Sequence, residues 1–330
     1  EAALAAHLSP GTAVAGVFTK SSTRADPVLD CQTKIGTESD AAAAFLINAG
    51  NANAFTGHQG QATVSELTQA VSRCLDLPES RVFTSSTGVI GEPLDHTQIT
   101  AHLDAMTASL GTASFEAAAS AIRTTDTYPK AACRTVDVDG KTVTLAGIAK
   151  GSGMIAPDMA TMLVYIFTDA ALTQSDAQSL VSNLADSTFN CITVDSDTST
   201  SDTLLFAATG TSGVESARSP AFKTAFHDVM KDLAHQVVRD GEGATKFITI
   251  HVRHAETGAD AKTVGLSIAN SPLVKTAIAG EDPNWGRVVM AVGKSGAKAN
   301  RDRLSIWFGK TQVAENGWVS PNYDEAPVAE

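Results

Sequence analysis

The chain has 330 residues, of which 43% are hydrophobic and 18% are charged, a composition typical of globular proteins. A chain of this length can bury a sizeable core, as one large unit or as two lobes. No apolar run is long enough to span a bilayer. The formal net charge of −12, without clusters of Lys and Arg, disfavours nucleic acid and anionic membranes as partners and favours small polar metabolites.

The cysteines are far apart in the sequence and form no CxxC pair: Cys31, Cys74, Cys133 and Cys191. This spacing indicates neither a disulfide scaffold nor a zinc site. The chain begins at Glu1 without a basic region that leads into an apolar one, so no secretion signal is predicted. We therefore expect a soluble protein of the reducing cytoplasm, without a bound metal.

Apolar residues recur at helical spacing in the first third of the chain. This period predicts amphipathic helices over residues 64–75 and 99–110, and Gly111 can cap the second of them. Hydrophobic alternation on both sides of Asp139-Gly140 then predicts a β-hairpin over residues 136–145. Both central residues of a type I′ turn need positive φ, which Asp and Gly tolerate.

The second half of the chain begins with a short apolar run over residues 162–167, which predicts a buried strand. Thr173, with Asp176 three residues later, is typical of a helix start. Further helices are predicted over 222–237 and 284–292, and further strands over 247–252 and 304–308. Because helices and strands alternate in blocks rather than in a βαβ rhythm, the pattern favours an α+β or layered architecture.

The most unusual segment is KGSGMIAPDMATML, from Lys150 to Leu163. Its glycine-rich loop leads a threonine, Thr161, directly into the predicted buried strand. If the Ala160–Thr161 bond is cut, this threonine carries a hydroxyl nucleophile and a free α-amine, whose ordinary pKa of about 7.7–8.0 suits a general base. Spacing alone is a weak signal, because most threonines at strand starts are structural.

Further distinctive segments lie before and after this one along the chain. They are AGVFTK (15–20), NAGNANAFTG (48–57), STGVIGEPL (86–94), TTDTYPK (124–130), DGEGATK (240–246) and EDPNWGRV (281–288). Together with the segment around Thr161, these motifs follow in order along almost the whole chain. In this set the chain resembles the ornithine acetyltransferase family, also called glutamate N-acetyltransferase, of arginine biosynthesis.

The resemblance implies a four-layered αββα sandwich of the N-terminal-nucleophile-like type, shared with DmpA, and a smaller second lobe. It also implies self-cleavage into an α fragment, 1–160, and a β fragment, 161–330. Both fragments contribute to one catalytic unit, and αβ pairs multimerise, as in a heterotetramer. Family members continue beyond the position of Glu330, so the residues near their C-terminus that complete the substrate pocket are expected outside this sequence.

The resemblance further implies a two-step transfer, in which Thr161 takes the acetyl group of N2-acetylornithine and passes it to glutamate. The products are ornithine and N-acetylglutamate, no cofactor is required, and use of acetyl-CoA as a further donor stays open. Thr87 and Gly88 would form the oxyanion hole. The substrate contacts implied are Thr124 or Thr125, Lys150, Thr161 and Glu242. A substrate with a carboxylate and an ammonium group suits this cation and this anion.

Plainer interpretations stand beside these. The STGVIG segment is otherwise a turn that leads out of a strand, and Lys150 and Glu242 are otherwise solvated surface charges. At the level of the whole protein, the alternatives are an N-terminal-threonine amidohydrolase or aminopeptidase of related architecture, and an uncleaved homologue with a binding role. Retention of Thr161, Thr87 and Gly88 disfavours the last.

Overall fold

The computed structural model describes residues 2–112, 114–156 and 162–329. The chain divides into two compact units, Glu1–Glu242 and Gly243–Glu330. The predicted cleavage position, between Ala160 and Thr161, lies outside the described residues. It falls within the sequence of the first unit, so the predicted fragment boundary and the boundary between the units differ.

The larger sheet of the first unit combines strands from both sides of the predicted cleavage position. In spatial order its strands are β2 (Ala13–Phe18), β8 (Thr203–Ala208), β7 (Leu163–Thr168), β6 (Lys141–Lys150) and β5 (Lys130–Val138). β7 and β8 run parallel, and the other neighbours run antiparallel. β7 is almost entirely apolar because it is buried on both faces, which explains why its sequence lacks polar alternation.

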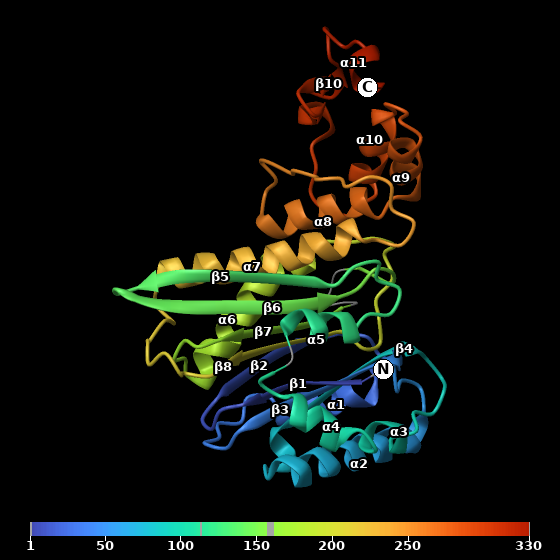
Figure 1. The fold of residues 1–330 in the computed structure, drawn as a ribbon. Coiled ribbons are helices and arrows are strands. Elements are labelled where there is room, and N and C mark those ends of the chain that lie inside the picture. Colours follow the sequence, from blue (N-terminus) through green and yellow to red (C-terminus); the bar gives the residue numbers. More distant parts are fainter. Residues whose placement is uncertain (1, 113, 157–161, 330) are drawn as a thin grey trace. The chain divides into compact units, whose positions relative to one another are not determined.

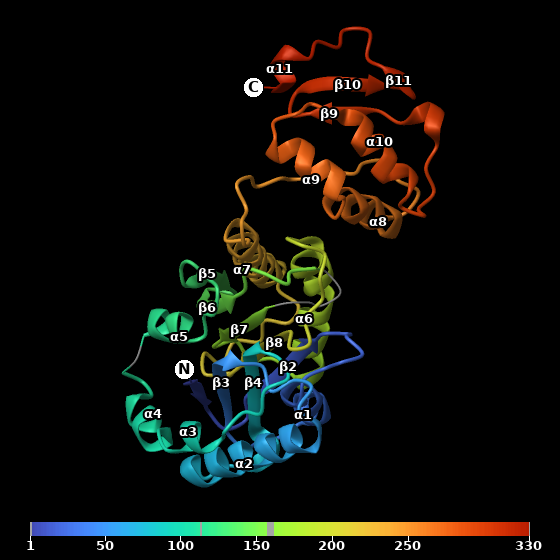
Figure 2. The ribbon, with the colours of Figure 1, turned by 90° about the vertical axis from the view of Figure 1, so that its right-hand side faces the viewer.

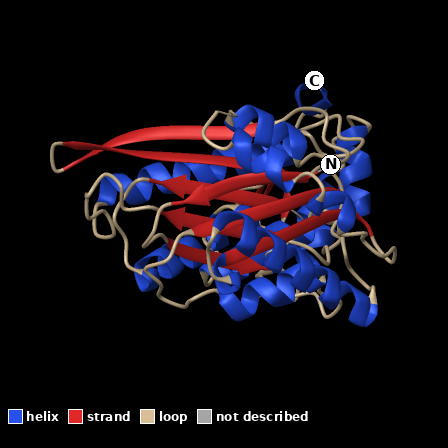
Figure 3. Cartoon of the chain, turned by 60° about the horizontal axis from the view of Figure 1, so that its bottom comes forward, coloured by secondary structure: helices blue, strands red, loops and turns tan. Residues whose placement is uncertain are grey.

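A smaller sheet packs against the inner face of the larger one (Figures 1 and 3). Its strands, in spatial order, are β1 (Ala2–Leu8), β3 (Ala43–Asn51) and β4 (Val82–Val89). β1 and β3 are antiparallel, whereas β3 and β4 are parallel. A parallel pair needs a crossover connection, and the helix between β3 and β4 provides it.

Helices cover the outer face of each sheet in the first unit (Figure 2). The outer face of the larger sheet is covered by α6 (Gln174–Ser187) and α7 (Pro220–Arg239), and that of the smaller sheet by α2 (Gly57–Leu75), α3 (Thr97–Thr100) and α4 (Leu103–Ser109). Two further helices, α1 (Asp26–Lys34) and α5 (Phe115–Ala121), contribute Cys31 and Ala119 to the core between the sheets. 3₁₀ turns lie at Glu79–Arg81 and Phe189–Cys191. The predicted start of α6 is confirmed, since the Thr173 hydroxyl accepts the Asp176 backbone N–H at 3.1 Å.

Three hydrophobic cores separate these layers. Phe206 of β8 packs on Phe226 of α7, with ring centroids 4.5 Å apart, between the larger sheet and its helices. Phe45 of β3 faces Tyr165 of β7 between the two sheets, with centroids 6.1 Å apart. Leu67 of α2 packs against the opposite face of the smaller sheet. The order of layers is helix, sheet, sheet, helix, which confirms the expected αββα arrangement.

The predicted hairpin is β5 and β6, joined by Asp139 and Gly140 with φ of 53° and 80°. Both values are left-handed, as a type I′ turn requires, so this prediction is confirmed. The single helix predicted over residues 99–110 is wrong, because the chain forms α3 and α4 instead. His102, with φ of −109° and ψ of 1°, leaves the helical conformation between them.

The second unit is helical with a small antiparallel sheet. Its elements are α8 (Gly258–Ala269), α9 (Pro272–Ala279), α10 (Trp285–Gly293), a 3₁₀ turn (Arg301–Arg303), β9 (Ile306–Phe308), β10 (Thr311–Glu315), β11 (Trp318–Val319) and α11 (Ala326–Ala329). The strand predicted over 247–252 is wrong, since this segment belongs to no sheet. Its apolar side chains Ile250 and Val252 pack on the core of α8 and α10 instead.

Candidate active site

Four strand ends meet at one edge of the larger sheet. Lys150, the last residue of β6, is paired with Leu163, the first residue of β7. Leu163 is in turn paired with Thr203, the first residue of β8, and the last residue of β2 is paired with Thr203 from the other side. Segments before and after residues 157–161 therefore form adjacent strands, which brings several motifs of distant sequence position to one edge.

Lys150 contacts two other predicted site residues at this edge. Its side chain is buried, with 8% exposed, and its Nζ donates to Thr87 Oγ1 at 3.1 Å and to Thr124 Oγ1 at 2.8 Å. Burial lowers the pKa of Lys150, and the charge of Lys130 lowers it further, while Asp126 opposes the shift. Lys150 is thus no solvated surface charge, and of the two candidate threonines it contacts Thr124.

Thr87 and Gly88 lie in β4 itself and not in a turn that follows a strand. Gly88 has φ of 131°, and a Cβ at this position would lie 2.2 Å from the Gly50 carbonyl carbon and 2.5 Å from its oxygen. Both the backbone conformation and the close approach of β3 therefore require a glycine. Gly88 is exposed and Thr87 is half-buried, so a substrate can reach both.

Glu242 is exposed and lies against the loop that follows Lys150. Its backbone N–H donates to the Ser152 carbonyl at 3.0 Å. A Cβ built on Gly153 would lie 2.5 Å from Glu242 Oε2, so the carboxylate passes directly over this glycine. The structure thereby brings Glu242 to the predicted glycine loop. Thr125, the neighbour of the Thr124 that Lys150 contacts, is exposed.

Gly153→Ala is expected to displace the Glu242 carboxylate and to weaken substrate binding. The atom in conflict is the far end of a flexible side chain, so the fold should persist. We expect KM for an ammonium-bearing substrate to rise roughly tenfold, equivalent to about 1.4 kcal/mol of binding, with little change in kcat. Steady-state kinetics measure this. Gly258→Ala, where no atom lies within 4 Å of the added methyl group, is the control and should leave KM unchanged.

A network of buried ion pairs is hydrogen-bonded to the glycine loop that follows Lys150. The Lys130 Nζ lies 2.6 Å from Asp126 Oδ1 and 2.6 Å from Asp240 Oδ2, and none of its side chain is exposed. Burial alone would raise the pKa of Asp126, but hydrogen bonds from Lys130 and the Gly151 amide hold it below its ordinary value. Both carboxylates are therefore ionised at neutral pH. The motifs found in the sequence contain these residues, but no local pattern indicated that they meet.

A second buried carboxyl, Asp202, lies at the same sheet edge with 3% exposed. Its Oδ2 accepts no hydrogen bond from the described residues. Burial raises the pKa of Asp202 well above its ordinary value, although the Met162 amide and the Lys150 charge oppose this. The Thr19 hydroxyl, which lies 2.8 Å from the Ser199 carbonyl oxygen, also opposes the rise in the pKa of Asp202 through a hydrogen bond.

Asp202→Asn is expected to stabilise the protein relative to the wild type increasingly as pH rises. A raised pKa in the folded state means that the carboxyl contributes its full stability only below its unfolded pKa. This contribution is lost as pH increases toward the folded pKa, whereas Asn does not titrate. Thermal unfolding from pH 4 to pH 8 should show a widening difference in Tm. Glu66→Gln, at an exposed site of α2, should show no such trend.

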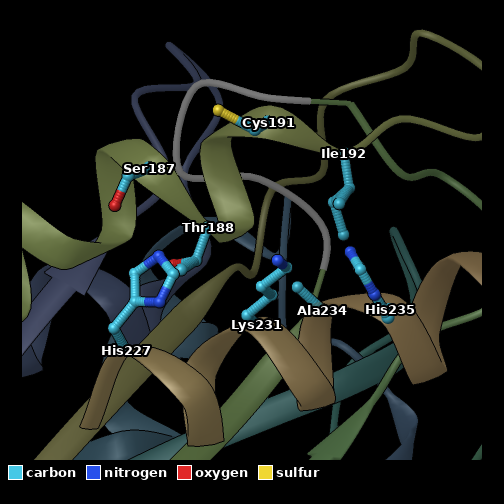
Figure 4. Close-up of a pocket in the computed structure, with 8 residues that line it drawn as sticks. All are labelled: Ser187, Thr188, Cys191, Ile192, His227, Lys231, Ala234 and His235. Atoms are coloured by element: carbon cyan, nitrogen blue, oxygen red, sulfur yellow. The ribbon is translucent and has the colours of Figure 1, made fainter. Parts of the chain in front are cut away.

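A small cavity of about 130 Å³ lies elsewhere in the first unit, between the end of α6 and α7 (Figure 4). It is lined by Ser187, Thr188, Cys191, Ile192, His227, Lys231, Ala234 and His235. Its volume is below that of ordinary small-molecule pockets, which are about 300–1,000 Å³. None of its lining residues is a predicted site residue.

The described residues contain no group of three or more His, Cys, Asp or Glu side chains arranged to hold a metal ion. Among the helices that the structure describes, none has both the length and the apolar character needed to cross a membrane.

Comparison with known proteins identifies the family. The ArgJ family matches residues 2–330. The arginine biosynthesis bifunctional protein ArgJ of Ruegeria pomeroyi is 65% identical over 324 residues, which cover 98% of this chain and 79% of that protein. Its counterpart from Agrobacterium fabrum is 52% identical over 322 residues, which cover 95% and 78% of the respective chains.

Two solved structures are also similar. The crystal structure of the arginine biosynthesis bifunctional protein from Bacillus halodurans is 36% identical, with a TM-score of 0.48, and the match covers 50% of this chain and 79% of that one. The crystal structure of the ornithine acetyltransferase from Mycobacterium tuberculosis, complexed with ornithine, is 25% identical, with a TM-score of 0.36. The match covers 48% of this chain and 98% of that one. On the sequence matches, the chain belongs to the ArgJ family and is an acyltransferase of arginine biosynthesis.

Proposed function

We propose that the chain moves the acetyl group of N2-acetylornithine to glutamate through an acetyl-Thr161 intermediate. The observation that carries this proposal is the contact of Lys150 with Thr87 and Thr124 at the end of β6. Leu163, which is paired with Lys150, follows the proposed nucleophile by two residues in the sequence.

Cleavage precedes transfer in this scheme. The Thr161 hydroxyl attacks the Ala160 carbonyl and the peptide bond to the Thr161 nitrogen breaks, which frees the α-amine and leaves Ala160 as an ester on the threonine oxygen. Water then hydrolyses this ester, which releases the Ala160 carboxylate and restores the Thr161 hydroxyl. In the mature enzyme this amine accepts the hydroxyl proton as the oxygen attacks the acetyl carbonyl. Ornithine leaves with a proton on its nitrogen, and the amine of glutamate then attacks the acetyl-enzyme in the second half-reaction.

The oxyanion of each half-reaction would be bound by the Thr87 hydroxyl and the Gly88 amide. The ammonium of Lys150 has three donors and no acceptor, so at Thr87 Oγ1 it must donate. The hydroxyl proton of Thr87 is thereby free to point to another acceptor. Such a fixed donor stabilises negative charge that develops in the transition state, and its removal costs about 10²–10³ in kcat.

The same argument applies to substrate recognition. Thr124 also accepts from Lys150, which leaves its hydroxyl proton available to a substrate oxygen. N2-acetylornithine has an α-carboxylate and a side-chain ammonium group. We assign the carboxylate to the Lys150 side and the ammonium to Glu242, which keeps each charge opposite its counterpart as both leave water.

Product analysis tests this function against the alternative of a hydrolase. The protein is incubated with N2-acetylornithine, with and without glutamate, and N-acetylglutamate and acetate are measured. We expect N-acetylglutamate to form with glutamate present and acetate release to be slow without it. Acetate release that glutamate does not affect would instead identify an amidohydrolase in which water accepts the acyl group.

Acetyl-CoA is a further donor under this proposal, in keeping with the word "bifunctional" in the names of the relatives. An acetyl-Thr161 intermediate is the same whichever donor forms it, so glutamate can accept the acetyl group from either. Acetyl-CoA and glutamate as sole substrates should yield N-acetylglutamate. If they yield none, the enzyme is restricted to the transfer from N2-acetylornithine.

The two fragments, 1–160 and 161–330, are proposed to stay associated after cleavage. β7 and β8 lie between β2 and β6, so strands of the later fragment are hydrogen-bonded on both sides to strands of the earlier one. We propose that αβ pairs multimerise to a heterotetramer, that no cofactor takes part, and that the enzyme works in the cytoplasm. In the described part of the chain, Cys31, Cys74, Cys133 and Cys191 form no disulfide, as a reducing compartment favours.

A further inference from the structure

We infer that Asp126 is a positioning residue for the acyl-transfer site, an inference that rests on the proposed function. Its carboxylate binds the backbone beside both residues that approach the substrate. Oδ2 accepts the Thr124 N–H at 3.1 Å, and Oδ1 accepts the Gly151 N–H at 2.7 Å. One buried side chain therefore sets the backbone that carries the Thr124 hydroxyl and the backbone that follows Lys150.

Asp126 can do this because it is itself held firmly. Lys130, four residues later, reaches its Oδ1 at 2.6 Å and bridges to Asp240 at 2.6 Å. Asp240 accepts the Thr127 N–H at 2.9 Å and also the Thr127 hydroxyl. These bonds fix the segment between Asp126 and Lys130. The network thus ties the turn around Thr124 to the C-terminal end of α7.

The same network reaches the remaining substrate residue. The Asp240 carbonyl accepts the Ser152 hydroxyl at 2.7 Å, and the Ser152 carbonyl accepts the Glu242 N–H at 3.0 Å. The three segments proposed to contact the substrate are therefore joined through Asp126, Lys130 and Asp240. Because each link uses a buried group or a backbone amide, a change at one of them moves its neighbours.

Asp126 also balances the charge of Lys150. Two carboxylates, Asp126 and Asp240, stand against two ammonium groups, Lys130 and Lys150, so the buried set is formally neutral. The charged or titratable groups that act on Lys150 are Asp126, Lys130 and Asp202, and Asp126 is the strongest that favours its charged form. Burial and Lys130 work in the opposite direction. Asp126 therefore preserves the ammonium that is proposed to meet the substrate carboxylate.

The test compares Asp126→Asn with Asp240→Asn in the full chain. Each variant removes one of the two carboxylates around Lys130, but Asp240 is not among the charges that shift the Lys150 pKa. We measure kcat/KM for N2-acetylornithine from pH 6 to pH 10. Asp126→Asn should lower it about 100-fold, the usual cost of a displacement of about 1 Å at a reacting centre. The alkaline limb of the pH profile of this variant should also move to lower pH, because Lys150 without the Asp126 charge loses its proton at a lower pH.

Asp240→Asn should leave the alkaline limb where the wild type has it, even if its rate falls. Equal pH profiles for the two variants would overturn the inference and reduce Asp126 to a structural residue. A wild-type protein without transfer activity would instead contradict the proposed function, so the two failures are distinguishable.

A double variant covers the case in which Asp126→Asn does not fold. Asp126→Asn with Lys130→Met removes Asp126 together with its ammonium partner, while Asp240 keeps the Thr127 N–H and hydroxyl as donors. It also removes both an anion and a cation near Lys150. We expect a reduced kcat/KM, because the hydrogen bonds to Thr124 and Gly151 are weakened, with a pH profile close to that of the wild type. Wild-type kcat/KM in a folded double variant would refute the positioning role.

Discussion

Thr161→Ala should abolish chain cleavage and acetyl transfer together. Without the hydroxyl, nothing attacks the Ala160 carbonyl, the α-amine stays in a peptide bond, and no acetyl-enzyme can form. Removal of a covalent nucleophile costs roughly 10⁶-fold in turnover, so transfer should fall below detection. Denaturing mass analysis reads the cleavage, and N-acetylglutamate formation reads the transfer.

Thr161→Ser is the matched control, because it keeps the hydroxyl and changes only one methyl group. It should still cleave and still transfer, at reduced rates. A Thr161→Ala protein that transfers acetyl groups at the wild-type rate would remove Thr161 from the mechanism. A wild-type protein that stays in one piece and is fully active would contradict the cleavage step alone.

Gly88→Ala is expected to have the second largest effect, on stability and on turnover. The new methyl group would meet the Gly50 carbonyl carbon at 2.2 Å, and backbone atoms cannot rotate away as a side chain can. A φ of 131° adds strain for any residue with a Cβ. We expect the free energy of unfolding to fall by roughly 2–6 kcal/mol, the sum of about 1–3 kcal/mol for backbone strain and about 1–3 kcal/mol for overpacking.

Turnover should fall as well, because a shift of β4 moves the Gly88 amide away from the oxyanion. We expect a loss of about 10²–10³ in kcat in the protein that remains folded. Gly91→Ala separates the two causes, since Gly91 has φ of 87° but no atom within 4 Å of the added methyl group. It should cost stability and leave kcat near the wild-type value. Full activity and stability in Gly88→Ala would refute the role given to this glycine.

The layered fold follows in part from the sequence. Periodicity alone reached α+β, whereas the αββα order and the smaller second unit came as implications of the motif resemblance. Prediction succeeded where a local cause decides the structure, as at the hairpin over residues 136–145 and at the start of α6. It failed at residues 247–252, where the same alternation of apolar residues suits either a strand or an irregular segment packed on helices. Only a hydrogen-bonded partner strand would make this segment part of a sheet.

The sequence by itself determined the family, the turn at Asp139-Gly140 and the helix start at Thr173. These features depend on motif order, on the φ that a residue tolerates and on a side chain that caps its own helix, all of which are local.

Only the tertiary structure decided how the site is held. Lys150 meets Thr87 across 63 residues of sequence, and Lys130 meets Asp240 across 110. No period or turn signal encodes such contacts, because they arise when separate strands and a helix bury charged groups that must then find partners. The ordered motifs thus predicted Thr161, Thr87, Gly88, Lys150 and Glu242 as site residues. The choice of Thr124 over Thr125 and the role of Asp126 came from contacts in the tertiary structure.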